Sequence, residues 1–198
     1  VIGLCSVTLG LVVGGLLGAA AAFYSGKTDN IIMRIMDILI ALPSFLLAIA
    51  IAAALGPSML NVIVAIAFGS IPNYARVTRA SILTVKDLEY IEAARAIGSN
   101  DRRIIFKHLI PNALAPIIVQ ATLGVAGAII SAAGLSFIGL GVQPPTPEWG
   151  AMLSAGKQYI RTNWNIVTFP GLTIMLSVFA LNLLGDGLRD ALDPKMKR

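Results

Sequence analysis

The sequence predicts an all-α integral membrane protein, a polytopic helix bundle. Hydrophobic residues make up 57% of the 198 residues and charged residues only 13%, about half the charged fraction of a soluble domain. Backbone groups within lipid must hydrogen-bond inside their own segment, and the apolar runs lack the alternation of barrel strands. Five runs approach or exceed the roughly 20 residues that cross a bilayer as a helix: 2–24, 35–56, 59–75, 113–140 and 166–186.

The first run is predicted to pack closely against another helix. Small residues recur at every fourth position from Ser6 to Gly26, with Gly10, Gly14 and Gly18 at the centre of the row. This spacing places them on one helix face, where a neighbouring backbone can approach. Because lipid gives helices no hydrophobic reason to associate, such close contact is what holds them together. We assign these three glycines a packing role rather than a chemical one.

Two prolines interrupt the second and third runs. Pro43 lies within 35–56 and Pro72 within 59–75. Each removes a backbone donor and can kink its helix. The sequence leaves open whether either position is a moving hinge or a static bend.

The segment 76–111 is polar and basic, lies between two apolar runs, and predicts two short helices joined by a glycine turn. Thr84 is the expected N-cap of the first helix, with Asp87 reaching back to form a capping box. Gly98 stands where a helix C-terminus takes a left-handed residue. Ser99 then reads as the N-cap of the second helix.

Each predicted short helix carries an apolar stripe. The first helix is expected to reach about Ile97, and the second to stop at Pro111. Their stripe residues are Leu88, Ile91, Ala94 and Ile97, then Ile104, Ile105, Leu109 and Ile110. An ordered, charged hairpin at a membrane surface has little reason to exist unless a partner docks on it. The pattern therefore predicts a docking site.

The segment 141–165 is expected to form a loop on the opposite side of the membrane. Three prolines precede Trp149, and Tyr159 and Trp164 follow. Proline forces an extended entry, and aromatic residues favour the membrane interface. Residues 148–161 are predicted to form a short surface helix. Two interpretations stay open, an interfacial anchor and part of a docking surface for an extracytoplasmic partner.

The distribution of basic residues predicts the orientation. All lysines and arginines except Lys157 and Arg161 lie in alternate loops or in the tail, and positive loops mark the cytoplasm. The N-terminus is therefore expected outside, and the 76–111 hairpin and the C-terminus in the cytoplasm. The basic residues line membrane edges without interleaved aromatic residues, so we expect no nucleic-acid partner.

The sequence shows no constellation suited to catalysis or metal binding. His108 is the only histidine and Cys5 the only cysteine, so no metal site is expected. The centres of the runs hold no ionisable residue, whereas ion-coupled carriers usually keep such groups there. Energy for any transport must then come from elsewhere. Four polar residues within the runs could line a path or bond to a neighbouring helix: Gln120, Ser131, Ser136 and Asn182.

The hairpin resembles the EAA loop of ABC importer permeases. Glu92-Ala93-Ala94, Gly98 and Pro111 stand at the spacing of that motif. The chain departs from the motif at His108 and Ile110, an ending similar to that of the dipeptide/oligopeptide branch. Three further stretches resemble this branch, the latter two its C-type permease of the dipeptide/oligopeptide/nickel class: 73–83, 135–150 and 182–195.

The resemblance implies a single permease domain over 1–198 with a type I ABC importer fold, in which the first of the usual six helices is missing here. It implies a bacterial or archaeal inner-membrane protein that is not an enzyme and binds no cofactor. Its implied partners are a homologous second permease, two ATPase subunits that bind ATP and Mg, and an extracytoplasmic solute-binding protein. The implied ATPase-coupling residues are Ile91, Glu92, Ala93, Ala94, Arg95, Gly98 and Pro111.

The expected cargo is di- or oligopeptides, with nickel or another solute as an alternative within the same class. A channel or secondary carrier with a regulatory cytoplasmic hairpin is the alternative outside it.

Overall fold

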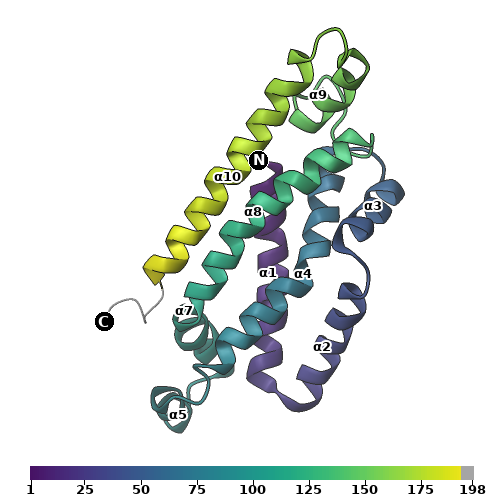
Figure 1. Ribbon diagram of the computed structural model, residues 1–198. Helices are drawn as coiled ribbons and strands as arrows, with labels where there is room; N and C mark the ends of the chain where they lie inside the picture. Colours follow the sequence, from purple (N-terminus) through teal and green to yellow (C-terminus); the bar gives the residue numbers. More distant parts are fainter. Residues whose placement is uncertain (193–198) are drawn as a thin grey trace.

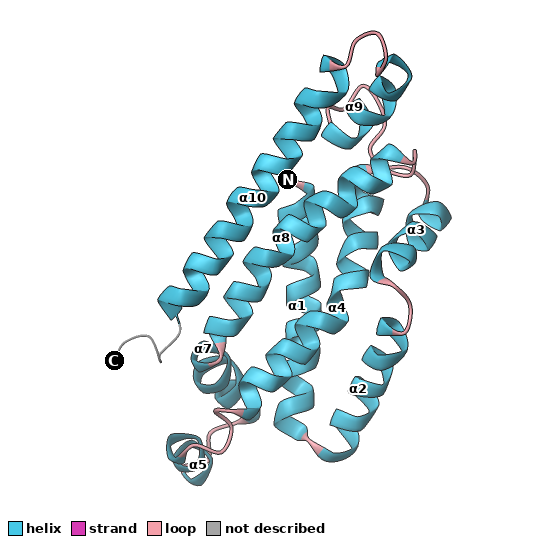
Figure 2. Ribbon diagram, viewed as in Figure 1, coloured by secondary structure: helices cyan, strands magenta, loops and turns pink. Residues whose placement is uncertain are grey.

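The computed structural model describes residues 1–192, which form helices joined by turns and loops and contain no strand. Four helices are long and apolar enough to cross a membrane: α1 (Ile2–Tyr24), α4 (Met59–Leu83), α8 (Leu114–Phe137) and α10 (Asn165–Leu192). They run side by side along the length of the molecule (Figures 1 and 2). The shorter α2 (Gly26–Ile40) and α3 (Ser44–Leu55) make a fifth span if they are counted together. The predicted all-α membrane bundle is confirmed.

The predicted second run is not one helix. Its two halves, α2 and α3, are bent by 84° at a short break. Pro43 is the N-cap of α3, with φ −53° and ψ 126°. A proline restricts the preceding residue to extended conformations, so the helix ends before it. The structure also begins α2 at Gly26, within a stretch that the sequence assigned to a loop.

Pro72 does not divide the third run. It lies inside α4, which continues to Leu83, eight residues beyond the expected end at 75. The extension carries the two arginines that hold α2 on α4. Arg79 donates to both carboxylate oxygens of Asp29 at 2.5 and 2.6 Å, and Arg76 donates to Asp37 at 2.6 Å. These ion pairs join polar parts of α2 and α4. The apolar content of the sequence alone therefore did not predict that both parts are helical.

The α1–α4 contact lies at the centre of the bundle, and the small-residue row faces it. A Cβ atom added at Gly14 would lie 2.5 Å from the carbonyl oxygen of Ile71 and 2.9 Å from the Cβ of Tyr74. Added Cβ atoms at Gly10 and Gly18 would likewise clash with α4. The glycines thus let two backbones approach more closely than any larger side chain allows.

At one end of the bundle, the short helix α9 (Trp149–Gly156) packs between α8 and α10 (Figure 1). A single 3₁₀ turn, Lys157–Tyr159, follows it. The carboxylate of Glu148 caps α9 by accepting a hydrogen bond from the Ala151 N–H at 2.7 Å. The predicted surface helix over 148–161 is therefore present in a shorter form.

Candidate coupling hairpin and membrane cavity

The hairpin lies at the end of the bundle opposite α9 (Figure 1). It contains α5 (Glu89–Ala96), α6 (Asp101–Arg103), the π-helical turn Ile104–Leu109, and α7 (Ile110–Asn112), which leads into α8. Gly98 has a φ of +78° at the turn after α5, the left-handed conformation that the sequence predicts. A residue with a side chain pays for this backbone conformation, and glycine does not.

Both expected N-caps are wrong. The backbone N–H groups of Val85 and Lys86 bond to the carbonyl of Ile82, so the chain continues in turns after α4. Thr84 is the C-cap of α4, and α5 begins only at Glu89. Between the short helices the cap is Asn100 rather than Ser99. The side-chain Oδ1 of Asn100 accepts a hydrogen bond from the Arg103 N–H at 2.9 Å, the bond that an N-cap supplies.

The second predicted helix is divided rather than continuous. A π-helical turn separates α6 from α7, and Pro111 lies within α7 instead of ending the helix before it. Proline has no N–H to donate to the residue four positions earlier. The ordinary helical ladder is therefore broken near Pro111, and the chain re-forms it in α8.

The inner side of the hairpin is buried against the base of α1. Ile91 is fully buried and Ala94 is 6% exposed, and both belong to one apolar cluster with Ala19 and Ala22 of α1. All four stripe residues of the second helix are buried or partly buried here. The first stripe was predicted too long, because its ends, Leu88 and Ile97, are exposed.

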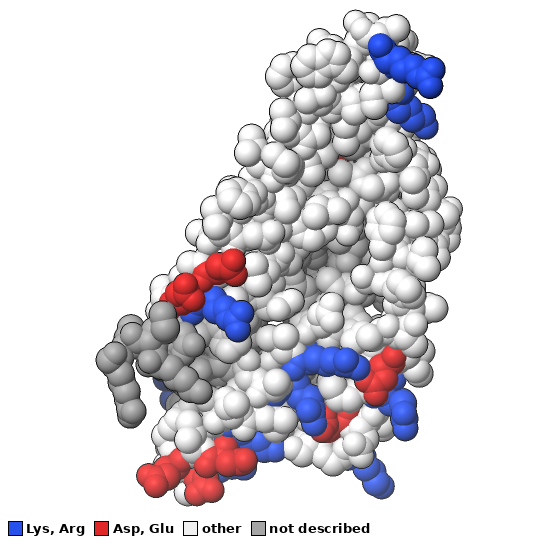
Figure 3. Space-filling view, in the orientation of Figure 1, with Lys and Arg blue, Asp and Glu red and all other residues white. Residues whose placement is uncertain are grey.

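The outer side of α5 combines acidic and small residues. Glu92, Ala93 and Gly98 are exposed, and Ile97 beside them is 82% exposed. Acidic side chains gather at the end of the molecule where Figure 1 places α5 (Figure 3). Arg95 is also exposed, but its guanidinium lies over the ring of Phe23 in α1, 5.5 Å from the ring centroid.

The predicted coupling residues therefore divide into two sets. Ile91 and Ala94 face the bundle, and Arg95 contacts α1. Glu92, Ala93, Gly98 and Pro111 are accessible to a partner. The spacing of the motif places all seven in one hairpin, and only the packing tells the two sets apart.

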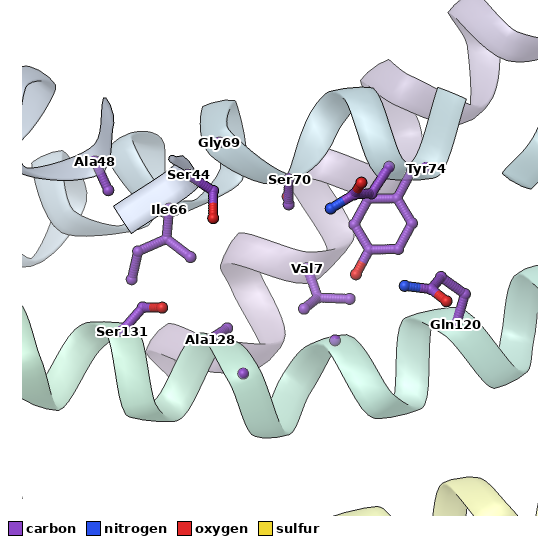
Figure 4. A pocket seen from close by; sticks show the side chains of 13 residues that line it. Val7, Ser44, Ala48, Ile66, Gly69, Ser70, Tyr74, Gln120, Ala128 and Ser131 are labelled. Atoms are coloured by element: carbon purple, nitrogen blue, oxygen red, sulfur yellow. The ribbon is translucent and has the colours of Figure 1, made fainter. Parts of the chain in front are cut away.

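A second feature is a cavity of about 190 Å³ between α1, α3, α4 and α8 (Figure 4). Gln120 and Ser131, two of the four polar path candidates, line it from the same face of α8. Four further polar residues that the sequence analysis missed also line it: Ser44, Ser70, Asn73 and Tyr74. The sequence held a signal for two of them, because Asn73 and Tyr74 are polar residues that directly follow Pro72 within the apolar run 59–75.

The cavity wall is uncharged and combines polar side chains with apolar residues and glycines. Its thirteen lining residues include no acidic, basic or histidine side chain. The hydroxyl of Tyr74 and the amide of Gln120 both point into the space (Figure 4). Hydroxyls and amides donate and accept hydrogen bonds, so the polar part of this wall can bind a polar solute or water.

The other two path candidates lie elsewhere. Ser136 is 3% exposed, and its Oγ accepts a hydrogen bond from the Val142 N–H at 3.2 Å, which holds the chain after α8. Asn182 lies on an exposed part of α10. Among residues 1–192, no group of acidic, histidine or cysteine residues could hold a metal ion.

The chain matches a protein family described as "Binding-protein-dependent transport system inner membrane component" over residues 10–198. It is 54% identical to the di/tripeptide transport system permease protein DppC of Pseudomonas aeruginosa over 99% of this chain and 65% of that relative. It is 52% identical to the dipeptide permease DppC of Alkalihalophilus pseudofirmus, over 99% of this chain and 64% of the relative. It is 50% identical to the glutathione permease GsiD of Pectobacterium atrosepticum, over 98% and 65%.

The chain spans slightly less than two thirds of the length of these three relatives. Solved structures share its fold at low sequence identity. An inward-facing MetNI methionine ABC transporter chain superposes with a TM-score of 0.77 at 21% identity, over 97% of this chain and 91% of that one. An amino acid ABC transporter gives 0.65 at 15% identity, over 96% and 90%. The predicted importer permease fold is confirmed, and the chain belongs to this family of multi-pass inner-membrane transport components.

Proposed function

We propose that this chain is the C-type permease subunit of a binding-protein-dependent ABC importer for di- or oligopeptides. It works with a homologous second permease, two ATP-binding subunits and an extracytoplasmic solute-binding protein. ATP and Mg are bound by the ATPase subunits, and the permease itself performs no covalent chemistry. The peptide class is supported by the relatives, which are named as di/tripeptide, dipeptide and glutathione permeases.

The hairpin is the observation that carries the coupling role. Tyr90, Ile97 and Phe106 are 40%, 82% and 57% exposed in a segment whose charged residues place it in water. Large apolar side chains exposed on a polar segment indicate an interaction site. Basic residues concentrate at this end of the bundle (Figure 3), which supports a cytoplasmic location for the hairpin. The C-terminal tail, 193–198, lies outside the described residues, and its cytoplasmic location rests on its basic residues alone.

In the proposed cycle, ATP binding closes the ATPase pair and moves the hairpin with it. The helix bundle then switches between inward- and outward-facing access, and the α1–α3–α4–α8 cavity opens to alternate sides. The cavity wall offers the solute hydrogen bonds without a fixed charge. Without a fixed charge, the wall does not hold an oppositely charged group of the solute strongly.

The direct test is purification of the full-length protein from its native membrane in mild detergent, with copurified subunits identified by mass. We expect a second permease and two ATPase subunits. A protein that purifies alone or with unrelated partners would contradict the importer and favour a channel or secondary carrier whose hairpin binds a regulator.

A substitution in the hairpin makes the test specific to the docking face. Ile97→Asp should reduce the copurified ATPase at least about tenfold, because it places a charge in an apolar contact, which costs at least about 1.4 kcal/mol. Ile160→Asp is the matched control, since Ile160 is 56% exposed and follows the turn after α9, and α9 lies at the opposite end of the molecule (Figure 1). Equal ATPase recovery from the two variants would contradict the proposal that the hairpin forms the ATPase interface.

A further inference from the structure

The hairpin packs against the C-terminal end of α1, and the base of α4 and the start of α8 belong to the same apolar cluster. Ile91 and Ala94 of α5 are buried in one cluster with Ala19 and Ala22, and Phe23 packs against the same cluster. The apolar contact positions α5, but apolar surfaces can slide because they carry no directional bond. A movement imposed on the hairpin needs directional contacts if α1 is to follow it.

Lys86 supplies the first directional contact. Its Nζ donates to the carbonyl oxygen of Ala22 at 3.0 Å and to the Oγ of Ser25 at 2.5 Å. The last carbonyls of a helix have no partner within it, and a cation there also complements the helix dipole. Ser25 has a φ of +52°, a conformation that is uncommon for residues other than glycine. Lys86 therefore holds the strained turn that ends α1.

Arg95 supplies the second. Its guanidinium lies over the ring of Phe23, 5.5 Å from the ring centroid, within the range of a cation–π interaction. Lys86 precedes α5 and Arg95 lies in its last turn. The two contacts therefore hold α5 at both ends against the last turn of α1.

α1 connects this attachment to the cavity. It is a continuous helix, and Val7, which lines the cavity, lies 16 residues from Phe23, about 24 Å along the axis at 1.5 Å per residue. Between them, Gly14 contacts Tyr74, whose ring also lines the cavity (Figure 4). α1 is therefore a rigid element with one end at the hairpin and the other at the cavity wall.

We propose that Lys86 and Arg95 are positioning residues that fasten the hairpin to α1, so that hairpin movement reaches the cavity through α1. This inference rests on the proposed importer function. It assigns to α1 a transmission role that the hairpin motif alone does not contain, because Lys86 lies outside the motif and Phe23 lies in a different helix.

The test uses the complete transporter in proteoliposomes and measures the ATP hydrolysed per solute transported. Lys86→Met and Arg95→Met should raise this ratio at least about threefold, with subunit composition, melting temperature and ATPase rate close to wild type. Lys27→Met and Arg34→Met are the matched controls, because both residues are exposed on α2 at the same end of the bundle. Lys86→Arg keeps a donor at this position and should return the ratio to the control level.

A double-mutant cycle separates the contact with Phe23 from other roles of Arg95. Phe23→Leu should raise the ratio as Arg95→Met does, and the combined variant should show no further increase. Additive effects would overturn the assigned contact. Should Lys86→Met not assemble, Ser25→Ala removes one of its two acceptors, and a ratio at the control level would then overturn the part assigned to the Lys86–Ser25 contact.

The outcomes distinguish this inference from the function on which it rests. Ratios for Lys86→Met and Arg95→Met equal to those of the α2 controls, in a complex that contains its ATPases, would overturn the fastening role alone. Loss of ATPase subunits from Arg95→Met would also overturn it, since Arg95 would then belong to the docking face. A wild-type complex without ATPases would instead contradict the proposed function.

Discussion

Replacing Gly14 by alanine should separate α1 from α4 and destabilise the bundle. The added Cβ would lie 2.5 Å from the Ile71 carbonyl oxygen, whereas ordinary contacts begin at 3.4 Å, so the backbones must part by roughly 0.9 Å at this point. Overpacking of this kind typically costs about 1–3 kcal/mol. The neighbouring backbone cannot rotate away as the end of a flexible side chain could.

Gly15→Ala is the matched control for this prediction. A Cβ at Gly15 would lie 3.7 Å from the nearest atom, the Oγ1 of Thr78. The two variants share the same chemical change in the same helix. They therefore share the gain in helix propensity and the loss of unfolded-state freedom, and their difference isolates the contact with α4.

The assay is thermal unfolding of the purified permease in detergent, followed by circular dichroism and tryptophan fluorescence. For a chain of this size, 1 kcal/mol shifts the melting temperature by about 2–4 °C. Gly14→Ala should therefore melt about 2–12 °C below Gly15→Ala. Equal melting temperatures would refute the reasoning, because they would show that the α1–α4 spacing can relax at no cost.

Two further predictions concern the ion pairs and the cavity. Asp29→Asn should lower the free energy of unfolding by about 1 kcal/mol even at high salt, because its two-bond pair is partly buried. Asp37→Asn should have an effect near zero in the same thermal assay, since its pair is about half exposed and screened. Gln120→Leu should lower the transport rate about fivefold, the equivalent of one hydrogen bond of about 1 kcal/mol, whereas Asn182→Leu, outside the cavity, should match wild type in the same uptake assay.

Each comparison has an outcome that would contradict it. Equal salt-resistant losses from the two aspartate variants would show that burial does not set the strength of these pairs. A reduced transport rate for Asn182→Leu together with a wild-type rate for Gln120→Leu would indicate that the solute path follows the surface of α10 and not the α1–α3–α4–α8 cavity. Both results can be read only in variants that assemble at wild-type levels.

The described helices show which features could be predicted from local sequence. The apolar runs identified the membrane spans, because hydropathy and bilayer thickness act on each segment separately. The glycine at 98 predicted its own backbone conformation, because a left-handed helix end is a local requirement. The roles of the coupling residues and of the path candidates stay predictions, since they depend on partners.

The mistakes share a physical cause. Thr84 and Ser99 have the chemistry of N-caps. The backbone N–H groups after Thr84 bond within the turn that follows α4, and the Arg103 N–H bonds to the side chain of Asn100 instead. α2 begins at Gly26 in a stretch that is not apolar, because Asp29 finds Arg79 on a helix 50 residues away. Contacts between segments distant in the sequence set these helix boundaries. A local sequence pattern does not contain information about such contacts.

The amino-acid sequence alone determined the class of the protein, four of its apolar spans and the place of the hairpin, since each follows from the composition and spacing of a continuous segment. The tertiary structure decided which polar residues share a cavity and which side of the hairpin faces α1. Gln120 and Tyr74 line one cavity only because α8 and α4 pack together. Lys86 reaches Ser25 only because the chain returns to the end of α1 after 61 residues. Helix packing determines which side chains lie together, because it brings residues into contact whatever their separation in the sequence.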